Sequence, residues 1–364
     1  MFGTTVETGN RGRRGIVGGL TVALLLSACG GAPATTGEAE VASTTTAPSA
    51  AESGTDPSVA DATATGATGP APTDATAAPS TTSTTTAAPT TCRSGRTTVV
   101  YRRIEGVPAR STSLDVHNPS GACGMPVWVW VHGGGYRRGD KAGQIADKVR
   151  LAAQQGWLLV SVNYRLTDPA NPVGARFPDH YEDVAAALAW IRQRIVPFGG
   201  DPTRVAVFGH SAGADIVSNV AVVPDHLASR GVDRRFIDCI GLLDTGGYDK
   251  VAALAADNRA SEIEGPMWEA ALGNNPDYLV ATSAARQIQP STWMPATLVA
   301  LRGSDARRAI AETMVTAVRS TGAATTVVDA RGLTHGEVNT RIGAAGDTVM
   351  TPPVVGFLRS CFAR

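Results

Sequence analysis

The sequence predicts an α/β domain with a mostly parallel central sheet, helices on both faces and a small cap. Short apolar runs with the composition of buried strands alternate with amphipathic stretches of helical length from residue 97 onward. Glycine-rich turns follow two of these runs directly, at residues 132–135 and 209–213. Nearly every aromatic residue lies after residue 100, so only this part of the chain can build a core.

The expected elements alternate along the chain in the manner of a parallel sheet covered by helices. Two short strands, at 97–103 and 113–117, are expected to pair antiparallel. The further expected strands are 127–131, 157–162, 205–208, 239–243, 297–301 and 324–328, and the expected helices are 143–155, 181–194 and 212–221. The segment 247–295 has a mixed pattern and is expected to form a cap over a pocket.

Composition divides the chain into three segments. Residues 1–29 have the basic start and the apolar run of a signal peptide, and the run is too short to span a bilayer. The run ends at Leu26-Ser27-Ala28-Cys29-Gly30, which resembles the lipobox of bacterial lipoproteins, where Cys29 would carry the lipid; an ordinary cleavage site is the alternative. Residues 30–91 are rich in Thr, Ala, Pro and Ser and are expected to be a disordered linker. Residues 92–364 are expected to be the folded domain.

The overall charge argues against several classes of partner. Lys and Arg together number 32, as do Asp and Glu, so the formal net charge is +0 and neither nucleic acid nor an anionic surface is favoured. A P-loop, a dinucleotide fingerprint and an H-E-x-x-H motif are all absent from the sequence. We therefore expect no organic cofactor and no metal, while the oligomeric state stays open.

The cysteines suggest export into an oxidising compartment. The chain has 5 cysteines, and assigning Cys29 to a lipid leaves an even set at 92, 123, 239 and 361. Four cysteines permit about three connectivities. We favour Cys92 with Cys123, which would staple the N-terminal hairpin, and Cys239 with Cys361.

The strongest functional motif is the pentapeptide Gly209-His210-Ser211-Ala212-Gly213. It follows an expected strand and precedes an expected helix, which is the context that a G-x-S-x-G nucleophile elbow requires. The sharp turn exposes the serine hydroxyl, and the amino end of the helix favours negative charge at the same place. Ser211 is therefore the candidate nucleophile.

A second motif, His132-Gly133-Gly134-Gly135, directly follows the expected strand 127–131. Glycines allow the backbone to approach a reacting group closely, and amide donors there would stabilise an oxyanion. We expect the amides of Gly134, Gly135 and Ala212 to form this oxyanion hole.

A serine nucleophile needs a base, and elimination among the 6 histidines leaves His335. It lies on a loop after the last expected strand, where the chain order of nucleophile, acid and histidine predicts the base. The acid is then expected after the preceding strand, where Asp305 stands; Asp329, nearer to His335 in sequence, is the competitor. The acid would orient the imidazole and stabilise its protonated form.

Read together, these motifs resemble the bacterial carboxylesterases of the α/β-hydrolase superfamily, near the feruloyl-esterase-like, kynurenine-formamidase-like and hormone-sensitive-lipase-like branches. The resemblance rests on residues 131–141, 162–166, 198–202 and 209–213, and it covers nearly all of the chain after residue 96. It implies that Asp140 braces the oxyanion loop and that Asp183 is structural. The loop around Asp305 is about one residue tighter than is usual in the family.

The expected activity is hydrolysis of small-molecule or lipid esters with small or medium acyl groups, through an acyl-enzyme on Ser211. Tyr136, His210 and Trp293 are the expected substrate-binding residues. Two alternatives remain open: transfer of the acyl group to an acceptor in the cell envelope, and an inactive surface module that only binds. A lipid on Cys29 would place the protein on the outer face of the bacterial membrane or in the envelope.

Overall fold

In the computed structural model, residues 91–171, 174–256 and 260–363 are described. They contain an eight-stranded sheet in the order β1-β2-β4-β3-β5-β6-β7-β8. The strands are β1 (Gly95–Val100), β2 (Ser113–Asn118), β3 (Met125–Val131), β4 (Leu158–Val162), β5 (Gly200–His210), β6 (Cys239–Leu243), β7 (Ala296–Leu301) and β8 (Thr325–Asp329). Strands β1 and β2 run antiparallel and β3 to β8 pair in parallel, so the predicted α/β sheet is confirmed.

Helices connect the parallel strands. The α-helices are α1 (Ala146–Gln155), α2 (Asp179–Arg194), α3 (Ala212–Val222), α4 (Asp225–Ala228), α5 (Lys250–Ala256), α6 (Gly265–Leu272), α7 (Pro276–Ala281), α8 (Ala284–Gln287), α9 (Asp305–Ser320), α10 (His335–Thr340) and α11 (Thr351–Phe362). Short 3-10 turns are η1 (Ala109–Thr112), η2 (Val196–Phe198), η3 (Arg234–Phe236) and η4 (Gly247–Asp249), and η5 (Ala260–Glu264) is a π-helical turn. Helices α4, α9, α10 and α11 were not predicted from the sequence.

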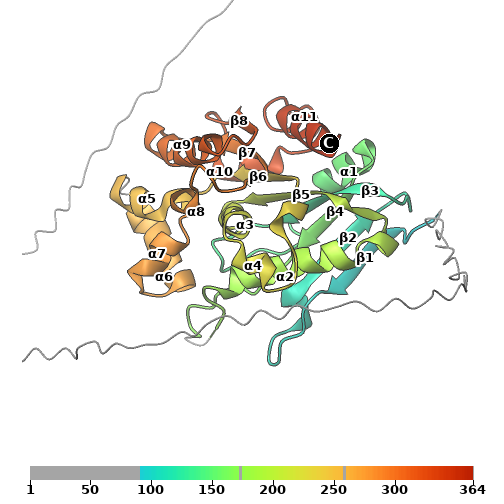
Figure 1. Cartoon of the computed structure of the whole chain (residues 1–364), viewed down its shortest axis with the longest axis horizontal. Helices are drawn as coiled ribbons and strands as arrows, with labels where there is room; N and C mark the ends of the chain where they lie inside the picture. The colour runs from blue at the N-terminus through green and yellow to red at the C-terminus, as the bar shows by residue number, and fades with distance from the viewer. Residues whose placement is uncertain (1–90, 172–173, 257–259, 364) are drawn as a thin grey trace, which may run out of the picture. The chain divides into compact units, whose positions relative to one another are not determined.

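Two hydrophobic cores fill the two faces of the sheet. Strand β3 contributes to both, because alternate side chains of a strand point to opposite faces. Trp128 and Trp130 join the core beneath α1 and α11, whereas Val127 and Val129 join the core beneath α2 and α3. Figure 1 shows α1 and α11 on one side of the sheet and α2 and α3 on the other. A strand buried on both faces explains why 127–131 is apolar without interruption.

The segment expected to form a cap is helical. It contains α5, η5, α6, α7 and α8, which gather at one end of the sheet (Figure 1). The buried Trp268 of α6 belongs to the same core as α2 and α3, and this aromatic packing joins the segment to the body of the domain. The helices of this segment lie between β6 and β7 in sequence, on the route from Ser211 to His335.

Both expected disulfides form. Cys92 is bonded to Cys123, and Cys239 at the start of β6 is bonded to Cys361 in α11. The second bond links residues 122 positions apart and lies within the core on the α11 face. The proposed signal peptide, the linker up to residue 90 and Cys29 lie outside the described residues. Within the described part, no helix combines the length and apolarity needed to cross a bilayer.

Candidate active site

Ser211 occupies a sharp turn between β5 and α3. Its backbone has φ 57° and ψ −124°, a conformation that non-glycine residues rarely adopt. The turn is possible because glycines flank it: a Cβ on Gly209 would overlap the Gly213 carbonyl, and one on Gly213 would stand 2.6 Å from the His132 oxygen. The amide of Ser211 donates to the Leu243 carbonyl at 2.9 Å, which ties the turn to the end of β6.

The glycine-rich loop after β3 packs directly on this turn. A Cβ on Gly133 would stand only 3.0 Å from the Cβ of Ser211. Gly134 and Gly135 have φ values of 118° and 60°. Among the described residues, no backbone carbonyl accepts a hydrogen bond from the amides of these two glycines. The loop therefore brings two uncommitted donors beside the serine, and Ala212 adds the first amide of α3.

Contacts with Tyr164 fix the position of His132, at the start of the glycine-rich loop. The His132 ring stacks on Tyr164 with 4.5 Å between ring centroids, and the Tyr164 hydroxyl donates to the His132 carbonyl at 3.0 Å. Asp140, expected to brace the loop, accepts hydrogen bonds from Asn163 and Arg110 at 2.9 Å each. Asp183, expected to be structural, is buried and pairs with Arg165 and with the partly exposed Arg102.

The imidazole of His335 meets a different carboxylate from the one that the sequence suggested. Its Nδ1 lies 2.6 Å from Oδ2 of Asp244, the residue that directly follows β6. The Asp244 side chain is 2% exposed and its φ is 52°, another strained conformation. The His335 side chain is 45% exposed, at the first position of α10 behind the capping box of Thr334.

Asp305 does not approach His335, and its selection as the acid needs correction. It is the first residue of α9, after the N-cap Ser304, and its side chain is 89% exposed and paired with Arg331 at 3.0 Å. An acidic residue in the first turn of a helix is favoured by the helix dipole, which accounts for Asp305 without catalysis. The competitor Asp329 is also exposed and pairs with Arg308.

The surroundings of Asp244 keep it ionised. Burial opposes ionisation, but the His335 hydrogen bond and the guanidinium charges of Arg307 and Arg302 outweigh it, so the pKa of Asp244 falls well below its ordinary value. Arg302 donates from Nε to Oδ2, and Arg307 Nε lies 3.3 Å from Oδ1. The carboxylate can therefore act as a fixed negative charge behind the imidazole.

His210 supports His335 instead of lining a pocket. It is 6% exposed, and its Nε2 donates to the His335 carbonyl at 2.8 Å, while the two rings lie 4.6 Å apart. Burial, then the neighbouring charge of His335, lower the pKa of His210 to about 3. A neutral His210 adds no positive charge beside the imidazole of His335.

Tyr136 is likewise unsuited to touch a substrate. It is fully buried, and its hydroxyl donates to Oδ2 of Asp215, in the first turn of α3. The other oxygen of Asp215 accepts from Lys250 Nζ at 2.8 Å, in an ion pair with no exposed surface. This cluster joins the glycine-rich loop after β3, the helix after Ser211 and α5, and no local sequence pattern predicted it.

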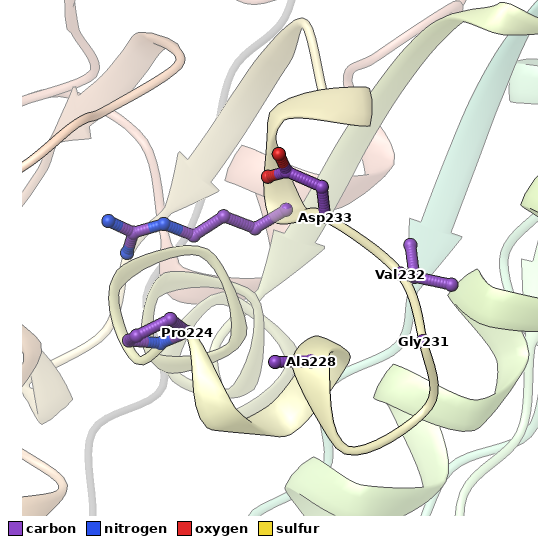
Figure 2. A pocket seen from close by; sticks show the side chains of 6 residues that line it. Pro224, Ala228, Gly231, Val232 and Asp233 are labelled. Atoms are coloured by element: carbon purple, nitrogen blue, oxygen red, sulfur yellow. The ribbon is translucent and has the colours of Figure 1, made fainter. Parts of the chain in front are cut away.

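Trp293 lies at the wrong edge of the sheet for substrate binding. It precedes β7, whereas Ser211 and Asp244 follow their strands, and a five-residue strand is about 17 Å long. Its ring lies 5.7 Å from the guanidinium of Arg234, which precedes β6. Arg234 also lines a cavity of about 350 Å³ beside α4, whose other lining residues include Pro224, Ala228 and Asp233, labelled in Figure 2. The expectation that Trp293 forms a pocket wall is therefore corrected.

His210, Asp244 and His335 also form a group with the spacing of metal ligands, within 4.8 Å of one another. Two hydrogen bonds already engage the ring atoms that face this group, His335 Nδ1 to Asp244 and His210 Nε2 to the His335 carbonyl. The close spacing is thus explained by a histidine–carboxylate pair and its support, which is the arrangement of a serine hydrolase base.

Strand order and the turn at Ser211 define the α/β-hydrolase fold, and solved structures agree. An esterase from the archaeon Pyrobaculum calidifontis, described as hyperthermophilic, superposes with a TM-score of 0.56 at 22% identity, over 69% of this chain and 81% of that one. At this identity the likeness establishes the fold.

Residues 112–237 match the carboxylesterase family. Acetylcholinesterase 4 of Caenorhabditis briggsae is 33% identical over 193 residues, 50% of this chain and 30% of that protein. The para-nitrobenzyl esterase of Bacillus subtilis (strain 168) is 35% identical over 142 residues, 36% of this chain and 28% of that protein. The chain thus spans about a third or less of the length of these relatives, and the family match includes Ser211 but ends before Asp244 and His335.

Proposed function

We propose that the chain is a serine hydrolase that cleaves carboxylic esters of small or medium acyl groups. Ser211 is the nucleophile, His335 the general base and Asp244 the carboxylate that orients it. The observation that carries this proposal is the His335–Asp244 hydrogen bond of 2.6 Å at the same sheet edge as a serine with φ 57°. The match of residues 112–237 to carboxylesterases supports the choice of esters.

The reaction would proceed by acyl transfer in two steps. His335 Nδ1 is engaged by Asp244, so Nε2 is the nitrogen left to accept the Ser211 proton as the hydroxyl attacks the ester carbonyl. The amides of Gly134, Gly135 and Ala212 would hold the oxyanion. Collapse expels the alcohol, which takes the proton from His335, and water then releases the acid by the reverse sequence of proton transfers.

Among the described residues, the Ser211 hydroxyl makes no hydrogen bond. The catalytic bond between nucleophile and base is often long without substrate and tightens in the Michaelis complex, so its absence is compatible with the mechanism.

A covalent test separates this function from an inactive binding module. A fluorophosphonate probe should label the wild-type protein, and Ser211→Ala should lose both labelling and turnover of a short p-nitrophenyl ester. Ser229→Ala, at an exposed serine, is the matched control and should keep both. Equal labelling of the two variants would contradict the assignment of Ser211.

We further propose that the protein is exported and carries a lipid on Cys29. Two disulfides in the folded domain support export, because such bonds persist in oxidising compartments. Metabolic labelling with an alkyne-tagged fatty acid should mark the wild-type chain and spare Cys29→Ser, which should appear in the medium or the soluble fraction. Labelling of Cys29→Ser at the wild-type level would contradict the proposal.

A further inference from the structure

Asp244 is held by more cationic groups than an orienting carboxylate needs. Its Oδ2 accepts from His335 Nδ1 and from Arg302 Nε, and its Oδ1 faces Arg307 Nε at 3.3 Å. Arg302 directly follows β7, and Arg307 lies in the first turn of α9, so three separate elements converge on one side chain. A residue with φ 52° keeps that conformation only when its surroundings hold it there.

Arg307 also reaches the helical segment between β6 and β7. Its Nη1 donates to Glu264 Oε1 at 2.6 Å, and Glu264 ends the turn η5. The second oxygen, Glu264 Oε2, is buried and has no hydrogen-bond partner among the described residues. A Cβ on Gly246 would stand 2.2 Å from Glu264 Oε2 and 2.6 Å from Arg307 Nη1, so the backbone of Gly246 packs directly against this ion pair. Three successive side-chain contacts therefore connect Glu264 to His335, through Arg307 and Asp244.

We propose that Arg302 and Arg307 are positioning residues, which fix the Asp244 carboxylate against His335. The negative charge of Glu264 would partly offset the positive charge of Arg307 at Asp244 and His335. The inference rests on the proposed function, since it assigns roles around the same base. It also implies that Glu264, in the turn η5, influences the basicity of His335.

The charges around this base predict shifts of opposite sign. The acid limb of the kcat/KM profile reports protonation of the essential imidazole in the free enzyme. Removing a positive charge near His335 favours its protonated form, so we expect loss of either arginine to move the acid limb to higher pH. Glu264 offsets Arg307, so loss of the Glu264 charge moves the limb to lower pH. His210 is neutral near pH 7 and adds no charge.

Coulombic estimates give the size of these shifts. A charge within about 4–6 Å changes a titration by about 1 unit or more, and partial exposure reduces the effect. The side chains of Arg302, Arg307 and Glu264 are 21%, 16% and 19% exposed. Arg302 Nε and His335 Nδ1 bond the same oxygen of Asp244, so we expect the acid limb to rise by about 1 unit in Arg302→Gln. The rise should be smaller in Arg307→Gln, which faces the other oxygen, and the fall in Glu264→Gln smaller again, because Glu264 reaches Asp244 only through Arg307.

Variants of Arg307 separate charge from geometry. Arg307→Lys keeps the charge and loses the planar fork that serves both Asp244 and Glu264. It should keep the acid limb within about 0.3 unit of wild type while kcat falls several-fold, because the carboxylate is less well held. Arg319→Gln, in the last turn of the same helix and exposed, is the control that should leave kcat and the profile unchanged.

The experiment is a set of kcat/KM profiles from pH 5 to 9 on one p-nitrophenyl ester, with a thermal melt for each variant. Where an arginine variant does not fold, the Glu264→Gln profile alone tests the proposal. Only an electrostatic effect of Glu264 on His335 predicts that its acid limb moves to lower pH. Wild-type protein without turnover or fluorophosphonate labelling would overturn the proposed function. An active wild type whose acid limb stays fixed, or moves the same way in Glu264→Gln and Arg307→Gln, would overturn the positioning roles alone.

Discussion

Replacing Asp244 by asparagine is the sharpest test of the acid at the site. The carboxylate is 2% exposed and its Oδ2 lies 2.6 Å from His335 Nδ1. An amide there can donate to the imidazole and favour the wrong tautomer, and it no longer stabilises the imidazolium. We expect kcat/KM to fall about 10³–10⁴-fold, equivalent to about 4–5.5 kcal/mol of transition-state stabilisation.

The chain provides a matched control for this change. Asp305→Asn makes the same substitution at an 89% exposed carboxylate, whose one ion pair, with Arg331, is also exposed. Surface pairs of this kind contribute little to stability, so activity should stay within about twofold of wild type. Both variants would be assayed on a short p-nitrophenyl ester at pH 8, with circular dichroism to confirm that each is folded.

One pattern of results would refute the reasoning. If folded Asp244→Asn keeps most of its activity while Asp305→Asn loses it, the hydrogen bond to His335 is not the catalytic one. The oxyanion donors and the nucleophile are unchanged in Asp244→Asn, so fluorophosphonate labelling should persist at a reduced rate. Complete loss of labelling together with loss of the native melt would instead show that Asp244 is needed for folding.

Three further predictions concern stability. Lys250→Met should lower the free energy of unfolding by about 3–5 kcal/mol in urea titrations, because Asp215 is left buried without its partner; an unchanged midpoint would contradict a charged pair. Removing the Cys239–Cys361 bond, which spans 122 positions, should cost about 2–5 kcal/mol and lower the melting temperature. His210 has its pKa lowered from 6.5 to about 3, so the folded state loses stability as pH falls through this range. His210→Asn should make that fall shallower by about 1.4 kcal/mol per pH unit, and an equally steep fall would exclude a neutral buried His210.

Local signals predicted much of the sheet and the position of Ser211. A strand buried on both faces leaves an uninterrupted apolar run, as in β3, and a nucleophile elbow needs glycines at fixed spacing. These signals depend on neighbours in sequence and can be recognised there. The connectivity of both disulfides was also predicted, helped by the small number of pairings that remained once Cys29 was set aside.

Asp244 was missed because the catalytic acid is defined by its position next to the His335 imidazole in the folded domain, and not by a local sequence motif. Any parallel strand end near His335 could supply the carboxylate, and the chain has acidic residues after β6, at the start of α9 and at the end of β8. One signal was available: Asp244 is the first residue after the apolar run 239–243, whereas Asp305 follows a helix N-cap serine. Ser304 indicates a helix start, where an acidic residue has an ordinary structural reason.

The expected substrate contacts failed for a related reason. Tyr136 and Trp293 were selected as aromatic residues near motifs or within the cap, but aromatic side chains are large and mostly serve the core. The ring of Tyr136 is fully buried, and its direction is set by the contact with Asp215, 79 positions away. No local pattern encodes such a pairing.

The position of Asp244 after β6 links the acid to the nucleophile through the backbone. In the order β5-β6-β7-β8, adjacent strands lie about 4.8 Å apart, so a carboxylate after β6 is one strand from Ser211. The Ser211 amide donates to the carbonyl of Leu243, the residue before Asp244, at 2.9 Å. A carboxylate after β7 would lack this direct connection, and here Arg302 occupies that strand end instead. The strained turn at Ser211 is therefore bonded to the residue that precedes the strained Asp244, and this bond ties the positions of nucleophile and acid to the same pair of strand ends.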